Sequence, residues 1–338
     1  APPPATCASG LPAGLMAPHL SPDDNLLSRL SRAGLRLTLQ QAQELLREGQ
    51  DWQGGGVLEH RLKGSGRPVH TEGFAADWSR AATAQERERA FLPPQAPAAW
   101  HGHAAWIRPG ALVQAWLGQP GIEWRGGVRV ASIERGDAGW RVLDEAGQRV
   151  AEAPLVVIAA ALGSAGLAGG RLWLQPVRGQ VSWALHTPGL PLPAFPVNGH
   201  GHLLPSVPMP GGQAWMTGST YGRGETDLAE RPGDHLANHE RLRTLVPLLA
   251  AQLAPAFASG QVQGWTGVRC ASTDRRPLVG EIEPGLWVST AMGSRGLTFA
   301  ALCGEVLAAR LHAEPLPLPL SLAAALDVQR QLGAKPPV

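Results

Sequence analysis

The chain has 338 residues, of which 44% are hydrophobic and 17% are charged, and its formal net charge is +2. These values exclude a disordered chain and are typical of one large α/β domain or two interleaved domains. The small net charge gives no electrostatic argument for a polyanionic partner such as nucleic acid.

Cysteine usage and hydropathy limit the class of protein further. Cys7, Cys270 and Cys303 are widely spaced and form neither a CxxC pair nor a disulfide framework. No segment approaches the roughly 20 consecutive apolar residues of a membrane span. The first residues lack the charge and apolar run of a signal peptide. We therefore expect a cytoplasmic protein.

The first third of the chain is predicted to contain two helices. Leucines at helical spacing over residues 22–49 predict a helix that begins at Ser21-Pro22 and ends at Gly49. Residues 50–100 are rich in turns and are interrupted by glycine and proline. A second helix is expected over residues 109–118, with Pro109 in its first turn.

The rest of the chain alternates between antiparallel β-structure and α/β-structure. A β-meander is predicted from Val128 onward, and the apolar run Leu155–Ala160 then predicts a strand buried on both faces of a parallel sheet. Residues 171–262 favour antiparallel strands followed by one amphipathic helix over 234–252. A strand at Gly285–Ala291, a tight turn and a helix at Leu297–Leu311 complete the pattern. It predicts a nucleotide-binding domain with a sheet-based substrate domain inserted into it.

The strongest local motif is Ala291–Thr298, which joins a predicted buried strand to a helix. Small residues at such a junction let a ligand approach the backbone, and the helix N-terminus offers free N–H groups and a positive dipole. These groups suit the edge of a flavin ring on which negative charge collects. An ordinary tight turn uses glycine in the same way, so the motif alone leaves both interpretations open.

A second motif, Gly267–Gly280, contains three arginines, an aspartate and a Pro-x-x-Gly turn. Arg269 here, or Arg295 in the first motif, could bind a substrate carboxylate through the two parallel N–H donors of its planar guanidinium group. The alternative is a solvated turn before a strand.

Histidines and tryptophans are assigned structural roles. The pairs His101/His103 and His200/His202 lack acidic or cysteine neighbours in the sequence, so we expect surface or loop histidines and no metal site. Most tryptophans are expected in the core or at its rim, although stacking on bases is the alternative.

In combination, the two motifs resemble the C-terminal part of the D-amino-acid oxidase-like flavoproteins. They are also similar to the FAD-dependent half of bacterial bifunctional tRNA wobble-uridine enzymes. Further matches lie at residues 8–20, 23–29, 176–182, 218–221 and 224–227, so the resemblance covers nearly all of residues 8–330.

The resemblance implies an α/β (α+β) fold in which a Rossmann-like FAD-binding domain is interleaved with an antiparallel-sheet substrate domain. The FAD-binding domain is expected over residues 1–34, 101–170 and 263–338, and the substrate domain over 35–100 and 171–262. Arg295 is expected to hold the substrate carboxylate, with Arg269 and Tyr221 as further active-site residues. The residues expected to contact FAD are Ser9, Ala13, Gly14, Val128, Val130, Ala159, Ala160, Gly293, Ser294, Arg295, Gly296, Leu297 and Thr298.

The implied reaction is the oxidation of the secondary amine of carboxymethylaminomethyl-uridine in tRNA, which leaves aminomethyl-uridine and glyoxylate. An oxidase of a small free amine or amino acid, and a cofactor-free remnant without catalysis, are the alternatives. The family opens with a strand, a G-x-G-x-x-G turn and a helix, yet Gly54–Gly56 follows no predicted buried strand and no predicted helix follows Gly64–Gly66. We therefore expect this first unit, and the methyltransferase domain normally fused upstream, to be missing from the sequence.

Overall fold

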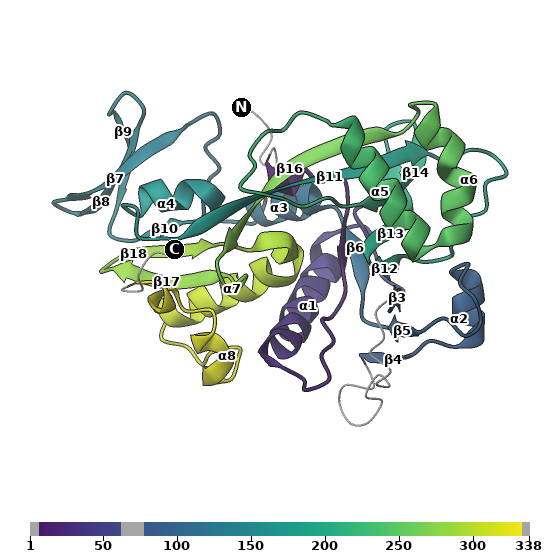
Figure 1. Cartoon of the computed structure of the whole chain (residues 1–338). Coiled ribbons are helices and arrows are strands. Elements are labelled where there is room, and N and C mark those ends of the chain that lie inside the picture. Colours follow the sequence, from purple (N-terminus) through teal and green to yellow (C-terminus); the bar gives the residue numbers. More distant parts are fainter. Residues whose placement is uncertain (1–6, 62–77, 333–338) are drawn as a thin grey trace.

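The computed structural model describes residues 7–61 and 78–332. Within these ranges the chain forms one large antiparallel-rich sheet and three smaller sheets, with helices packed on them (Figure 1). The mixed α/β architecture expected from the sequence is therefore confirmed.

The first helix, α1, is shorter at both ends than the leucine pattern predicts. It spans Leu26–Leu45, and the side chain of Asn25 accepts a hydrogen bond from the backbone N–H of Ser28, as an N-cap does. The helix ends because Leu46 adopts an extended conformation. The helix α3 (Pro109–Leu117) begins at Pro109 as expected.

The large sheet has the strand order β15-β11-β14-β13-β12-β3-β5-β4, and β16 pairs with β11. All neighbours are antiparallel except β12 and β3, which are parallel. Its strands are β3 (Val57–His60), β4 (Ser79–Ala81), β5 (Ala98–His101), β11 (Leu174–Leu185), β12 (Val197–Gly199), β13 (Gly201–Met209), β14 (Gly212–Gly218), β15 (Gly222–Arg223) and β16 (Gln263–Ser272). The segment 50–100, expected to be turn-rich, thus also supplies three strands of this sheet and the helix α2 (Ala84–Arg89).

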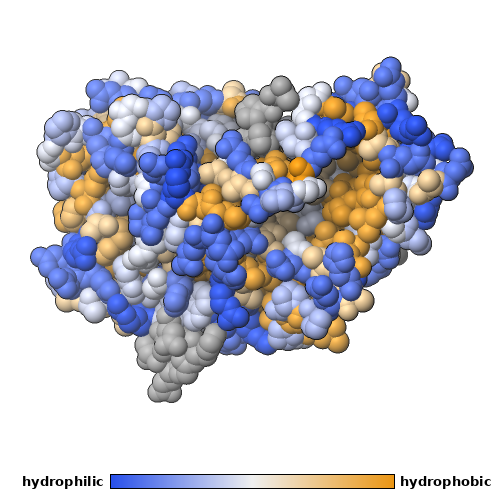
Figure 2. Space-filling view, turned by 180° about the vertical axis from the view of Figure 1, so that it is seen from behind, coloured by the Kyte–Doolittle hydropathy of each residue, from blue (hydrophilic) through white to orange (hydrophobic). Residues whose placement is uncertain are grey.

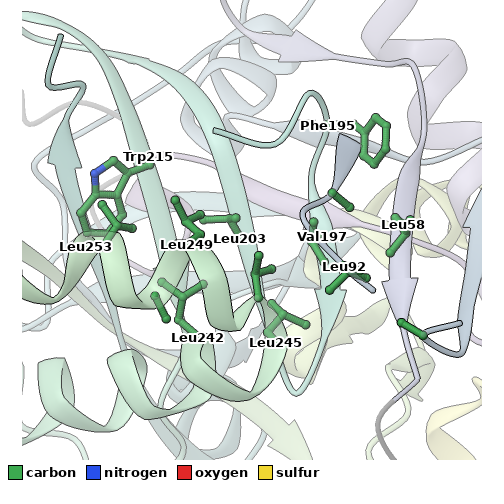
Figure 3. Packing of buried hydrophobic residues seen from close by; sticks show 14 of the residues in the cluster. Leu58, Leu92, Phe195, Val197, Leu203, Trp215, Leu242, Leu245, Leu249 and Leu253 are labelled. Carbon is green, nitrogen blue, oxygen red and sulfur yellow. The ribbon is translucent and has the colours of Figure 1, made fainter. Parts of the chain in front are cut away.

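One face of this sheet is covered by two helices where the sequence predicted one. They are α5 (Pro232–Leu245) and α6 (Pro247–Ala258). The break occurs because Val246 leaves the helical conformation and Pro247 starts a new helix at its first position. Figure 3 shows leucines of both helices directed toward Leu203 and Trp215 of the sheet, all of them buried.

A three-stranded sheet lies next to the large one and has the order β10-β18-β17. Its strands are β10 (Val156–Ile158), β17 (Leu278–Glu283) and β18 (Leu286–Thr290). The parallel pairing of β10 with β18 confirms the predicted parallel strand. The prediction that this strand is buried on both faces is wrong. Leu155 is 39% exposed, and among the described residues of β10 Ile158 is the only buried one. β10 lies at the edge of this sheet.

The predicted β-meander is confirmed as β7 (Val130–Gly136), β8 (Gly139–Asp144) and β9 (Arg149–Ala153). The short helix α4 (Ser164–Leu167) follows β10. A third small sheet has the order β1-β6-β2, formed by β1 (Gly14–Met16), β6 (Ala105–Ile107) and β2 (Trp52–Gln53).

The helix α7 (Gly296–Leu311) leaves β18 and packs against α1, and α8 (Leu320–Ala324) completes this layer (Figure 1). The contact is close: a Cβ on Gly34 would lie 2.0 Å from the carbonyl oxygen of Thr298. The hydroxyl of Thr38 donates a hydrogen bond of 2.7 Å to the carbonyl of Leu297. The middle of α1 therefore braces the first turn of α7.

The opposite face of the molecule carries hydrophobic patches separated by hydrophilic residues (Figure 2). None of the helices within the described ranges combines the length and the apolar character needed to cross a membrane.

Candidate functional site

A cavity of about 810 Å³ lies where the two main sheets meet. Its walls come from the N-terminal segment 7–20, the end of β10, strands β11, β13 and β16, and the turn between β18 and α7. This volume is within the range of cofactor and substrate pockets.

The turn Gly293–Arg295 forms one wall and leads directly into α7. Gly293 has a φ of +59°, a conformation that favours glycine. No side chain caps the N-terminus of α7, so its first N–H groups are left for a ligand, and the helix dipole favours negative charge there. On the facing segment, a Cβ on Gly14 would lie 2.6 Å from Cδ1 of Leu297, so a larger residue there would require the Leu297 side chain to move.

These features fit the edge of an isoalloxazine ring. A flat ring needs a narrow space between two backbones, and its anionic edge needs N–H donors. Gly293–Thr298 offer the start of a helix as donor, and Gly14 lines the same cavity, so these residues would hold the ring.

Most of the residues predicted for the site do lie around this cavity. The residues that line it are Ser9, Gly14, Ala159, Ala160, Gly293, Ser294, Arg295, Gly296, Leu297, Thr298, Arg269 and Tyr221. Three others do not line it. Ala13 is fully buried in an apolar cluster with Trp106 and Met216, because it alternates with its neighbour Gly14. Val128 and Val130 lie outside the cavity at the start of the meander, where Val128 is 47% exposed.

Arg269 and Arg295 are the two arginines of the cavity. Arg269 Nη2 donates a hydrogen bond of 2.6 Å to Ser219 Oγ, and its guanidinium lies 4.6 Å from the centroid of the Tyr221 ring. The guanidinium also covers Gly179, where a Cβ would be 2.1 Å from Nη1.

Burial lowers the pKa of both arginines below the usual value for a guanidinium. Within the described ranges, neither has a carboxylate partner. Arg178, in contrast, is buried and pairs with Asp234. Two desolvated cations without an anion form a site for an anionic ligand group, because an unpaired buried charge is costly.

Further polar and aromatic residues line the cavity without having been predicted from the sequence, and Glu59, Asn198, His202 and Trp265 are among them. His202 lies on β13, its Nε2 is buried without a partner, and burial together with the Arg269 charge lowers its pKa to about 4. The expectation that the paired histidines are surface or loop residues is wrong for two of them. His101 is fully buried on β5, and its Nε2 donates to Glu59 at 2.9 Å. The alternation of side chains along a strand was the only available signal, since it places His200 and His202 on one face.

The described part of the chain contains no group of three or more histidine, cysteine or acidic residues that would hold a metal ion. Burial raises the pKa of the Cys303 thiol to about 12 and raises that of Cys270. Both thiols are therefore protonated at neutral pH and are poor nucleophiles.

Comparison with known proteins agrees with this geometry. The model of the family described as "DAO: FAD dependent oxidoreductase" matches residues 1–310. The chain is 51% identical to the tRNA 5-methylaminomethyl-2-thiouridine biosynthesis bifunctional protein MnmC of Polaromonas naphthalenivorans (strain CJ2), over 98% of this chain and 55% of that protein. It is also 51% identical to the protein of the same name from Polaromonas sp. (strain JS666 / ATCC BAA-500), over 96% of this chain and 54% of that protein.

The chain thus spans about half the length of these relatives. Among solved structures, glycine oxidase from Geobacillus kaustophilus superposes with a TM-score of 0.75 at 20% identity, covering 96% of this chain and 89% of that one. The match over residues 1–310 and the cavity at α7 lead to one conclusion: the chain belongs to the DAO family of FAD-dependent oxidoreductases, and FAD is its cofactor.

Proposed function

We propose that this chain oxidises the secondary amine of carboxymethylaminomethyl-uridine at the wobble position of tRNA. The products are aminomethyl-uridine and glyoxylate. The observation that carries amine oxidation with a carboxylate-bearing substrate is the pair of desolvated arginines, Arg269 and Arg295, beside the uncapped N-terminus of α7. The names of the 51% identical relatives support a tRNA uridine substrate.

In this proposal the arginines bind and orient the substrate. The carboxylate of the carboxymethyl group pairs with the two guanidinium groups, which fixes the carbon between carboxylate and nitrogen in one position. FAD, when bound, supplies the two-electron oxidant for the C–H bond of that carbon. The backbone of Gly293–Thr298, with Ser9, Gly14 and Ala159–Ala160, would hold it. Water then adds to the substrate-derived imine, and cleavage of its C–N bond releases glyoxylate and leaves the primary amine on the uridine.

The charge of the cavity suits this chemistry. Because the pKa of His202 is lowered to about 4, its imidazole adds no positive charge beside the amine at neutral pH. The amine must be neutral when its neighbouring carbon is oxidised, and the two guanidinium groups favour the neutral form by repelling a proton. No acid–base pair is required for binding or orientation.

Such an enzyme works in the cytoplasm, where bacterial tRNA is found. Its product is a primary amine, and the 5-methylaminomethyl group in the relatives' name supports the addition of a methyl group to that amine in a later step. We therefore propose a methyltransferase domain as its functional partner.

The second candidate is an oxidase of a small free amine or amino acid. A pair of arginines suits any α-amino carboxylate, and this observation favours both candidates equally. Steady-state assays with modified tRNA, glycine and N-methylglycine distinguish them. A cofactor-free remnant is distinguished by the absence of flavin absorbance in the purified protein.

The arginine assignment is tested by Arg295→Leu and Arg269→Leu. We expect kcat/KM to fall by about 100-fold or more in each, because a desolvated carboxylate loses a charge-assisted partner. The flavin absorbance per protein molecule should stay near that of the protein without the substitution. Arg129→Leu, at an arginine whose side chain is 81% exposed on the meander, is the matched control. Near-normal turnover in both cavity variants would contradict the assignment.

A further inference from the structure

One row of side chains crosses three neighbouring strands at the floor of the cavity. Glu59 on β3 pairs with Asn198 on β12, and Asn198 pairs with His202 on β13. His202 in turn pairs with Gly218 on β14. Directly paired residues project from the same face of a sheet, so Glu59, Asn198 and His202 form one line. All three line the cavity.

The acidic end of the row is fixed in place. Glu59 is the only carboxylate among the described residues that line the cavity. Its Oε2 accepts the hydrogen bond from His101 Nε2, and His101 Nδ1 lies 2.8 Å from the buried hydroxyl of Ser79. The bond from His101 lowers the pKa of Glu59 in spite of its burial, so the side chain is an acceptor only.

The second carboxylate oxygen, Oε1, is left for a ligand. It forms an ion pair with Arg61 Nε at 3.8 Å, which is beyond hydrogen-bond distance, and among the described residues it accepts no hydrogen bond. A held carboxylate with one free oxygen is a specific acceptor for a single N–H donor.

The other end of the row lies beside the arginine that we assign to the substrate carboxylate. The charge of Arg269 acts on His202, and the buried His202 Nε2 has no partner. Two strand spacings of about 4.8 Å separate His202 from Glu59, so the row extends roughly 10 Å from the cationic end. Along the cavity floor, the positive charge of Arg269 is therefore followed by the neutral polar side chains of His202 and Asn198 and then by the negative charge of Glu59.

We propose that Glu59 recognises the base of the substrate by accepting a hydrogen bond from the N3–H of a uracil-type ring. Asn198 and His202 then lie beside the exocyclic oxygen or sulfur atoms of the ring. The inference rests on the proposed function, because it requires a substrate whose carboxylate and base are held at opposite ends of the row. Glycine and N-methylglycine have no ring and are too short to reach Glu59 from the arginines.

The experiment measures binding by isothermal titration calorimetry, with the FAD-loaded full chain kept reduced by dithionite in the absence of oxygen, so that the ligands bind without being oxidised. The ligands are 5-carboxymethylaminomethyl-uridine, its N3-methyl derivative and N-methylglycine. The unmodified protein should bind the N3–H nucleoside about 10- to 100-fold more tightly than the N3-methyl one, because the derivative leaves a buried carboxylate oxygen without a partner. This measurement needs no variant and is independent of any effect on folding.

Two substitutions assign that preference to Glu59. Glu59→Gln should weaken binding of the N3–H nucleoside about 10-fold and leave N-methylglycine unchanged. Glu59→Ala should reduce the preference for N3–H over N3-methyl to less than about threefold. Glu305→Gln removes the same charge from an exposed position on α7 outside the cavity and should behave as the unmodified protein.

Equal binding of both nucleosides, or equal weakening of all three ligands by Glu59→Gln, overturns the inference. If the chain oxidises the modified uridine without any N3–H preference, the inference alone fails. If it binds and oxidises N-methylglycine but not the nucleoside, the proposed function fails and the inference fails with it.

Discussion

At the scale of single residues, the contact between Tyr221 and Arg269 is open to solvent on one side. The tyrosine is 55% exposed, and its ring faces the guanidinium at 4.6 Å. A cation–π contact of this kind contributes about 0.5–2 kcal/mol. We expect Tyr221→Leu to raise KM several-fold while kcat changes less, because the arginine loses a positioning contact. Tyr221→Phe keeps the ring and should resemble the unmodified enzyme in steady-state kinetics. Equal loss in both variants would assign the effect to the hydroxyl.

The lowered pKa of His202 predicts how the free energy of unfolding depends on pH. Its pKa is lowered from 6.5 to about 4 in the folded chain, so between these values the unfolded chain binds a proton that the folded chain does not. The free energy of unfolding should therefore fall as the pH is lowered from about 6.5 to 4, by at most about 3 kcal/mol from this residue. Urea unfolding at pH 7 and pH 5 measures the change. His202→Gln should lose about 2 kcal/mol less than the unmodified chain over this interval, and parallel losses would contradict the prediction.

Individual residues of the site differ in how far the sequence predicts them. Arg269, Arg295 and the turn at Gly293 belong to contiguous motifs, so their chemistry is visible locally. Glu59 and Asn198 meet only because β3 and β12 pair in parallel with one particular register. No local pattern encodes that register, which depends on the packing of the whole sheet.

At the scale of elements, the contact between α1 and α7 depends on a glycine. A Cβ on Gly34 would meet the Thr298 carbonyl oxygen at 2.0 Å, so Gly34→Ala forces the helices apart. We expect a loss of about 1–3 kcal/mol in the free energy of unfolding, and weaker FAD binding because the first turn of α7 is displaced. Chemical denaturation and flavin titration measure the two effects.

Gly304 on α7 is the matched control for that substitution. It also lies within a helix, but a Cβ there would meet no atom within 4 Å. Gly304→Ala should stabilise the chain by about 0.5–1 kcal/mol, because alanine loses less backbone entropy in a helix. A stabilising Gly34→Ala would show that the helices adjust without cost.

Element boundaries follow from local chemistry that periodicity does not capture. The leucine pattern extends past both ends of α1, yet Asn25 caps the helix later than expected and Leu46 ends it earlier. Likewise, apolar spacing continues through residues 234–252, although Pro247 cannot donate to the preceding turn and so starts α6. Caps and prolines set these limits, whereas the pattern predicts only that helices exist.

At the scale of the whole molecule, the sequence predicted the alternation of α/β and antiparallel parts but not the strand order. The large sheet joins strands from residues 57–101 with strands from 174–272, and such long-range pairing leaves no mark on either segment. The expected domain boundary at residues 34 and 35 falls inside α1, so a helix crosses it. The domain ranges stay a prediction.

The hydrogen bond from Thr38 to Leu297 joins residues that are 259 positions apart, and it braces the turn assigned to the flavin. During synthesis on the ribosome, α1 emerges long before α7, so the flavin pocket is completed only after α7 has been made. Loop closure over such a distance is also slow. In refolding experiments, we therefore expect tryptophan burial to precede the quenching of added FAD fluorescence. Simultaneous signals would contradict this order. Nascent chains that end before α7 would therefore carry no flavin, and cofactor uptake would report that α1 and α7 have packed together.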